Sequence, residues 1–254
     1  MPASAEVWSV ARLLEWSTPW LKGRGVESPR LDAEILLAHV LGVDRVWLVT
    51  HREDEVKSMH LGEFREALKR RGAREPVARI TNRASFFRET YALGPGTLVP
   101  RPESEFIVEG ALERWQQRAE GCVADVGTGS GCLALSFLKG APGARALLVD
   151  LASEALVVAA ANAATLGLSG QCQFLKGDLL TSAREDSLDA VLSNPPYISG
   201  VELATLEPEV RLFDPVLALD GGPDGFKVHR RLFPQIFRSL KPGEFAEVEV
   251  GWDQ

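Results

Sequence analysis

The stretch that decides the fold is Asp-Val-Gly-Thr-Gly-Ser-Gly at residues 125–131. It follows a short apolar run and precedes a segment that we expect to be helical. Glycines here would let backbone N–H groups approach a ligand closely at a helix N-terminus. A dinucleotide fingerprint would place its third glycine at Cys132, and the Lys-Ser/Thr pair of a P-loop is missing. For this stretch alone, a plain tight turn between strand and helix remains the alternative.

Helices and short strands alternate around this loop from residue 102 onward. We predict strands over residues 122–126, 146–150, 172–176, 189–193 and 243–250, and helices over residues 103–118, 131–138, 153–165 and 225–239. Such alternation indicates right-handed crossovers and a parallel, doubly wound α/β sheet.

Polar residues end four of the predicted strands: Asp125, Asp150, Asp178 and Asn194. In open α/β sheets, ligands bind at the carboxyl ends of the strands. Asp150 stands where a nucleotide-binding fold places an acid for the ribose hydroxyls, although it could instead cap a helix. Asp178 could accept from an adenine amine beside the Leu179 N–H, or form only an Asx turn. Acids without a phosphate-directed Lys or Arg suit an adenosine ligand that lacks phosphates, and S-adenosylmethionine fits this description.

The fourth of these strands runs into Asn194-Pro195-Pro196-Tyr197. Two consecutive prolines cannot continue a sheet ladder, because neither has an N–H to donate. The carbonyls of Asn194 and Pro195, beside the flat ring of Tyr197, suit a planar NH2 group as the acceptor of a methyl transfer. An ordinary turn at the end of a strand is the alternative.

The first 75 residues have a different pattern, typical of helices. Ser28-Pro29 predicts a helix start, with Ser28 as N-cap, and Gly42 predicts its end. A third amphipathic stretch covers residues 61–69. Residues 76–100 hold short apolar pieces broken by Gly-Pro-Gly at 94–96, and we predict a β-hairpin linker there.

Composition excludes several classes of protein. The chain has 254 residues, 45% of them hydrophobic, and a net charge of −7. No run approaches the ~20 apolar residues of a membrane span, and residues 1–6 do not begin a signal peptide. The three cysteines are scattered and the four histidines lack metal-ligand spacing from them, so we expect a cytoplasmic protein without disulfides or bound metal. The acid excess lies after residue 75, which disfavours a phosphate backbone as direct partner.

Several further segments carry a family resemblance. They are Ser-Pro-Arg-Leu-Asp-Ala-Glu at 28–34, Glu-Pro-Val-Ala at 75–78, Leu-Val-Pro-Arg-Pro-Glu-Ser-Glu at 98–105 and Gly-Gly-Pro-Asp-Gly at 221–225. With the Asn-Pro-Pro-Tyr motif, they closely resemble the HemK-type release-factor glutamine methyltransferases, from about residue 10 to the end. The motif alone is shared with enzymes that methylate amino groups of nucleic-acid bases, but DNA adenine methyltransferases lack the flanking segments.

The resemblance implies a class I S-adenosylmethionine-dependent methyltransferase that releases S-adenosylhomocysteine. It implies an N-terminal helical domain over 1–75 that recognises substrate, the hairpin linker over 76–100 and a methyltransferase domain over 101–254. The implied catalytic residues are Asn194, Pro195 and Tyr197, and Pro196 joins them in substrate binding. The expected cofactor residues are Asp125, Gly127, Thr128, Gly129, Ser130, Gly131, Asp150, Asp178, Leu179 and Asn194.

Two departures from the family pattern stand out. Phe213-Asp214-Pro215 occupies the place of an expected Phe/Tyr-Glu-Pro. The sequence stops at Gln254, just after the fifth predicted strand, where the family usually continues through a helix and two more strands.

The implied reaction methylates the glutamine of the Gly-Gly-Gln tip of class-1 peptide-chain release factors, with no membrane and no direct nucleic-acid partner. Two alternatives remain. The same chemistry could act on a glutamine of a ribosomal protein or on a nucleic-acid base, or the chain could be a silent module that only binds partners. The intact motif at Asn194 disfavours the silent module.

Overall fold

The computed structural model describes residues 7–116 and 118–254. Residues 1–6, in which we expected no signal peptide, lie outside this part. Residue 117, at the end of the predicted helix 103–118, also lies outside it. The chain divides into two compact units, with the boundary between Thr81 and Asn82.

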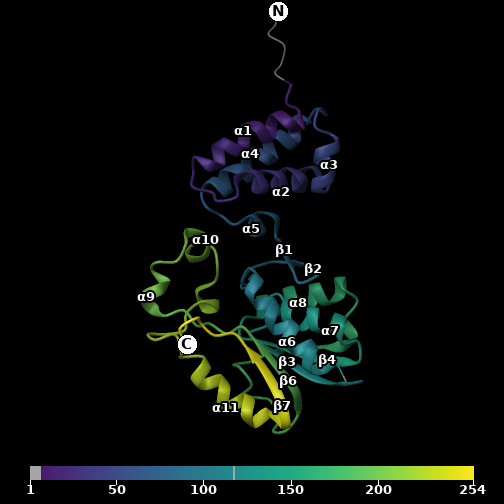
Figure 1. The fold of residues 1–254 in the computed structure, drawn as a ribbon, viewed down its shortest axis with the longest axis vertical. Helices are drawn as coiled ribbons and strands as arrows, with labels where there is room; N and C mark the ends of the chain where they lie inside the picture. Colours follow the sequence, from purple (N-terminus) through teal and green to yellow (C-terminus); the bar gives the residue numbers. More distant parts are fainter. Residues whose placement is uncertain (1–6, 117) are drawn as a thin grey trace, which may run out of the picture. The chain divides into compact units, whose positions relative to one another are not determined.

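The first unit is helical, as its sequence pattern predicted (Figure 1). Gly42 ends the second helix in a left-handed conformation, with φ of 68°. Ser28 occupies the N-cap position, as predicted, although its side chain makes no capping hydrogen bond. The helices are α1 (Val10–Lys22), α2 (Pro29–Leu41), α3 (Arg45–Thr50), α4 (Ser58–Gly72) and α5 (Val77–Thr81).

The predicted hairpin linker is shorter than expected. Its first residues form α5 and belong to the helical unit rather than to a linker. The hairpin consists of β1 (Arg83–Phe86) and β2 (Glu89–Ala92), which pair antiparallel. Our reading missed α5 because five residues are too few to show a helical period.

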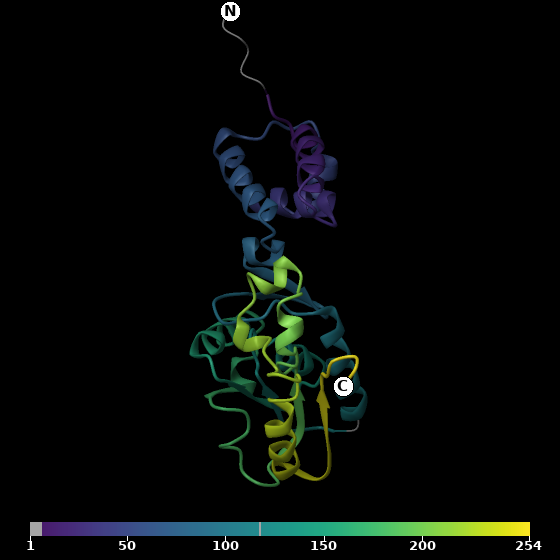
Figure 2. The same cartoon turned by 90° about the vertical axis from the view of Figure 1, so that its left-hand side faces the viewer.

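The second unit contains the predicted sheet. Its strands are β3 (Gly121–Val126), β4 (Ala144–Asp150), β5 (Cys172–Lys176), β6 (Leu188–Ser193) and β7 (Leu240–Val248). They are ordered β5-β4-β3-β6-β7 and all neighbours are parallel, which confirms the predicted fold class. Figure 2 shows β6 and β7 side by side with their arrowheads at the same end.

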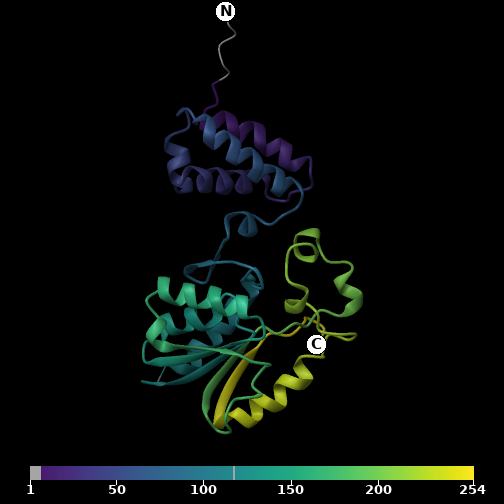
Figure 3. The ribbon, with the colours of Figure 1, turned by 180° about the vertical axis from the view of Figure 1, so that it is seen from behind.

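Helices cover both faces of this sheet, because each strand exposes alternate side chains to opposite faces. One face packs on α6 (Glu105–Trp115), α7 (Cys132–Gly140) and α8 (Ser153–Thr165), with Val123 and Leu192 among its buried residues. The other face packs Val126 and Val191 against α11 (His229–Ser239). Figure 3 shows α7 and α8 on one side of the sheet and α11 on the other.

Between β6 and α11 the chain makes a long excursion for which the sequence pattern had predicted no element. It contains α9 (Gly200–Leu203), α10 (Pro208–Arg211) and a short 3-10 helix (Val216–Ala218). The Ile198 N–H donates to the Leu219 carbonyl at 3.0 Å and closes the excursion at its base. Helix α11 starts at His229 rather than at 225, where Gly225 has a φ of 77° that is not helical.

Candidate active site

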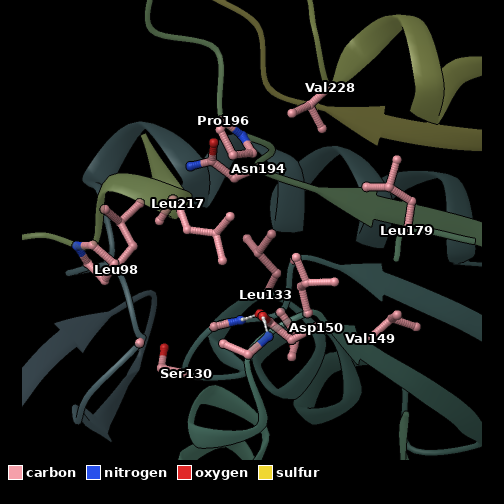
Figure 4. Close-up of a pocket in the computed structure, with 18 of the residues that line it drawn as sticks. Leu98, Ser130, Leu133, Val149, Asp150, Leu179, Asn194, Pro196, Leu217 and Val228 are labelled. Atoms are coloured by element: carbon pink, nitrogen blue, oxygen red, sulfur yellow. Dashed lines mark hydrogen bonds between the residues drawn. The ribbon is translucent and has the colours of Figure 1, made fainter. Parts of the chain in front are cut away.

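A cavity of about 450 Å³ lies at the carboxyl ends of the strands in the second unit. Figure 4 shows Asn194 and Pro196 at one end of it, Asp150 at the other and Leu133 between them. The wall also includes apolar side chains from the segment before α6 and from the excursion, notably Leu98 and Leu217. A volume of this size suits a cofactor-sized ligand.

The glycine-rich loop after β3 forms part of the wall through residues 127–130. A Cβ on Gly127 would meet no atom within 4 Å, so the backbone is open to a ligand there. Gly131 is different, because a Cβ would lie 3.0 Å from Leu135 and 3.2 Å from Ala159. Gly131 therefore allows close packing around the start of α7, and the structure does not place it in the wall where we expected it.

The N–H groups of this loop are mostly used within the protein. The Gly127 and Thr128 N–H groups donate to the Val149 carbonyl, Gly129 donates to Asp150, and Gly131 donates to Thr128. These four N–H groups are therefore already bonded within the protein, and the expectation that N–H groups at the start of α7 approach a ligand stays a prediction. The bonds close the loop onto β4 and hold its shape.

Asp125 also differs from the prediction. Its side chain is fully buried beneath the loop and is absent from the cavity wall. One carboxylate oxygen accepts from the Thr128 hydroxyl at 2.7 Å and from the Ala134 N–H at 3.1 Å, while the other has no partner. Burial raises the pKa of Asp125 to about 6. Asp125 thus holds the loop in place from inside the protein, and it does not line the cavity in which a ligand would bind.

Asp150 lies in the cavity wall at the end of β4, as predicted. Its two carboxylate oxygens accept from the Gly129 N–H and the Ala152 N–H, each at 2.9 Å. Burial raises the pKa of Asp150, and the two N–H donors oppose that shift. Each oxygen keeps a further lone pair, so the carboxylate is held in place and can still accept from a ligand hydroxyl.

Asp178 and Leu179 line the same cavity beyond β5. Leu179 adopts a positive φ of 56°, which turns the chain sharply at this point. The Asp178 carboxylate pairs with the guanidinium of Arg231 on α11. The sequence pattern gave no sign of this pairing, because the partners are 53 positions apart in the chain.

Asn194 presents its side chain to the cavity and has a well-defined partner. Its Nδ2 donates to the Ser104 hydroxyl at 2.8 Å, which leaves Oδ1 as an acceptor. Pro196 is in the wall, whereas Pro195 is buried and outside it. Among the hydrogen bonds of residues 7–116 and 118–254, none uses the carbonyl of Asn194 or Pro195.

The Tyr197 side chain is half-buried and does not form part of the cavity wall. Its hydroxyl donates to the Glu249 carboxylate at 2.8 Å. The pKa of Tyr197 is raised mainly by burial and, to a smaller extent, by the negative charge of the neighbouring Glu249. The hydroxyl therefore keeps its proton. The prediction that its ring covers an acceptor group therefore rests on the motif and not on the wall of this cavity.

Sequence reasoning missed two groups of site residues. Ser104 and Glu249 connect to Asn194 and Tyr197, and Glu249 follows β7 at the same sheet edge as the predicted acids. We had placed residue 249 inside the last strand, so its position at a strand end went unnoticed. The second is the pairing of Arg101 with Asp214, which the sequence named only as parts of separate family segments. Asp214 is buried and also accepts from the Val99 N–H at 3.4 Å.

Comparison with known proteins agrees with this architecture. The family model "PrmC N-terminal domain" matches residues 12–81, and "Methyltransferase small domain" matches residues 107–209. The chain is 42% identical to "Release factor glutamine methyltransferase" of Caulobacter vibrioides over 92% of this chain and 81% of that one. The chain belongs to the release factor glutamine methyltransferase family. The resemblance that the motifs indicated is thereby confirmed, and the enzyme class is methyltransferase.

Other release factor glutamine methyltransferases support this family membership. The protein of Moorella thermoacetica is 40% identical over 92% of this chain and 82% of its own length, and that of Rhodospirillum rubrum is 42% identical over 100% and 78%. A more distant match is found among solved structures. A ribosomal protein L11 methylase from Lactobacillus delbrueckii subsp. bulgaricus has 23% identity and a TM-score of 0.42, covering 62% of this chain and 66% of that one.

Residues 7–116 and 118–254 also lack two kinds of feature. They contain no group of three or more His, Cys, Asp or Glu arranged to hold a metal ion. Over the same residues, no helix is both long and apolar enough to cross a membrane. That the protein binds no metal, and that it has no direct nucleic-acid partner, remain two predictions from the sequence.

Proposed function

We propose that this protein transfers a methyl group from S-adenosylmethionine to the side-chain amide nitrogen of the glutamine in the Gly-Gly-Gln tip of class-1 peptide-chain release factors, in the cytoplasm. The observation that carries the proposal is the orientation of Asn194. Its free Oδ1 is an acceptor at the end of the cavity opposite Asp150, which suits the NH2 group of a glutamine. Family membership supports the same substrate class.

The cavity residues fit S-adenosylmethionine. Asp150 would accept from the ribose hydroxyls, and the loop at 127–130 would pass along the ribose and methionine part. Asp178 and Leu179 would border the adenine, with the Asp178 carboxylate able to accept from its amine. The loop offers few unused N–H groups, which agrees with a nucleoside ligand that carries no phosphate.

The reaction needs a weak nucleophile to be positioned well, because delocalisation ties up the lone pair of an amide nitrogen. When bound, the cofactor supplies a methyl group made electrophilic by its sulfonium. Asn194 Oδ1 and the Pro195 carbonyl would accept the two N–H bonds of the glutamine amide, which orients the nitrogen and increases its electron density. Positioning of this kind is worth up to roughly 7–11 kcal/mol. We assign no general base, and the proton released after transfer goes to water.

The helical unit would provide the second contact with the substrate. A Gly-Gly-Gln tip is small, so contacts within the cavity offer little area for recognition. A contact elsewhere on the release factor would raise the effective concentration of the tip at the cavity. We therefore assign substrate recognition to the first unit, and cofactor and chemistry to the second.

Mass spectrometry tests the proposal directly. A class-1 release factor is incubated with the protein and isotopically labelled S-adenosylmethionine, and the labelled site is mapped by peptide sequencing. We expect one added methyl group on the glutamine of the Gly-Gly-Gln tip. Label on a ribosomal protein or on a nucleic-acid base instead would transfer the same chemistry to another substrate, and no label on any of them would refute the proposed activity.

A further inference from the structure

Glu249 lies outside the cavity wall, yet it is connected to two residues of the Asn-Pro-Pro-Tyr motif. Its Oε1 accepts from the Tyr197 hydroxyl at 2.8 Å. Its Oε2 accepts from the Ser104 hydroxyl at 2.6 Å, and the Ser104 oxygen accepts in turn from Asn194 Nδ2 at 2.8 Å. One carboxylate thus holds the first and last residues of the motif.

We propose that Glu249 is a positioning residue that sets which end of the Asn194 amide faces the methyl acceptor. This inference rests on the function proposed above. The argument depends on the direction of each hydrogen bond. A carboxylate only accepts, so the hydroxyl proton of Ser104 must point toward Glu249. The Ser104 oxygen then has only lone pairs to offer, so Asn194 must turn its NH2 group toward it and its Oδ1 toward the cavity.

This polarity matters because an asparagine amide is nearly symmetric in shape. If the amide were turned over, its NH2 group would face the NH2 group of the acceptor glutamine, and one of the two proposed acceptor carbonyls would be lost. A donor facing a donor also leaves both groups without a partner, which is costly in a buried site. Glu249 prevents that orientation through Ser104.

Glu249 is itself firmly held. Its N–H donates to the Ser193 carbonyl at 3.0 Å, which continues the pairing of β7 with β6 beyond the last strand residue. Its carbonyl lies 3.0 Å from Nε2 of the buried His229, and because a carbonyl only accepts, that nitrogen carries the proton. Ser104 is also buried. The carboxylate is therefore held in place and can fix the direction of the hydrogen bonds that it accepts from Ser104 and Tyr197.

Kinetics on a Gly-Gly-Gln peptide test this role. In Glu249→Ala and in Ser104→Ala we expect kcat to fall at least tenfold, while the cofactor Kd from calorimetry stays within twofold of wild type. The double variant should be no more than threefold slower than the slower single variant, since both changes interrupt one chain. Glu247→Ala is the matched control: Glu247 pairs with Arg114, and we expect kcat within twofold. A kcat within threefold of wild type in either single variant, or multiplicative losses in the double, would overturn the inference.

A second measurement separates this inference from the proposed function. The side-chain NH2 signals of Asn194 are assigned by their loss in Asn194→Ala and followed by hydrogen exchange. We expect slow exchange in the wild type and at least tenfold faster exchange in Ser104→Ala and Glu249→Ala, whether or not the release factor is methylated. Unchanged exchange in both variants would refute the positioning role, while failure of the wild type to methylate would refute only the function.

Discussion

The Asp150 carboxylate at the end of β4 accepts a hydrogen bond from the Gly129 N–H in the loop after β3, with 2.9 Å between the two atoms. This bond joins neighbouring strands at their carboxyl ends and places an anionic acceptor in the cavity wall. The acceptor is thus oriented before any ligand arrives. Its side-chain conformation need not be ordered on binding, which lowers the cost of binding.

Asp150→Ala should weaken the binding of S-adenosylmethionine by roughly tenfold to a hundredfold. Loss of hydrogen bonds from a ligand to a charged acceptor costs about 1.5–3 kcal/mol, and each 1.4 kcal/mol is tenfold in affinity. Isothermal titration calorimetry measures the change. Glu154→Ala, on the first turn of α8 and exposed, is the control and should bind as wild type does. Wild-type affinity in Asp150→Ala would remove the ribose assignment.

Asn194→Ala should abolish methylation while cofactor affinity stays within a few-fold of wild type. Oδ1 is assigned to the acceptor amide, so its loss appears in the rate. Asn194→Asp should fail as well. A carboxylate next to the sulfonium changes the local charge, cannot donate to the Ser104 oxygen, and adds a second negative charge near Glu249. Single-turnover methylation of a release factor gives the rates. Half the wild-type rate or more in either variant contradicts the mechanism.

Asp125 should make the stability of the second unit depend on pH. Its pKa rises from 3.8 to about 6 on folding, so the folded state binds the proton more tightly than the unfolded state. The contribution to stability is complete below about pH 4, falls as the pH rises from 4 to 6, and stays lost above that. Urea denaturation across pH 4–8 should show a shallower decline in Asp125→Asn than in the wild type. Parallel curves would mean that Asp125 does not titrate in this window.

Asp214→Ala should raise KM for the release factor several-fold and leave cofactor affinity unchanged. Asp214 is buried and pairs with Arg101, so it ties the excursion to the segment before α6, and both supply parts of the cavity wall. Asp214→Glu, which restores the acid that the family pattern led us to expect, should keep KM within threefold. Steady-state kinetics decide this. A larger effect on cofactor affinity than on KM would place the pair in cofactor binding instead.

Removal of residues 1–81 should raise KM far more for a whole release factor than for a short Gly-Gly-Gln peptide. The cut follows the boundary between the units, so α5 is removed with the other helices. Circular dichroism and calorimetric binding of the cofactor establish that the remaining unit is folded. Equal losses on both substrates would show that the helical unit only supports the fold.

The sequence by itself determined the architecture. Alternating strand and helix patterns around residues 125–131 predicted a parallel sheet, and the structure has it with β4 and β5 ending at the predicted Asp150 and Lys176. Asp150, Asp178 and Asn194, which the structure places in one cavity wall, could be named from the sequence because strand ends are local features that a pattern of apolar runs reveals. The motif segments were enough to indicate the family for the same reason, since each is continuous in the chain.

Only the tertiary structure decided how these residues are supported. Asp125 ends a strand like the others, but α7 and the loop bury it, and no local pattern distinguishes a strand end in the wall from one beneath it. Ser104, Asn194, Tyr197 and Glu249 come from three separate segments, and Ser104 and Glu249 are 145 positions apart in the sequence. Hydrogen bonds between such distant groups form only because the sheet brings its strand ends to one edge, so the orientation of the Asn194 amide is a property of the fold and not of the motif.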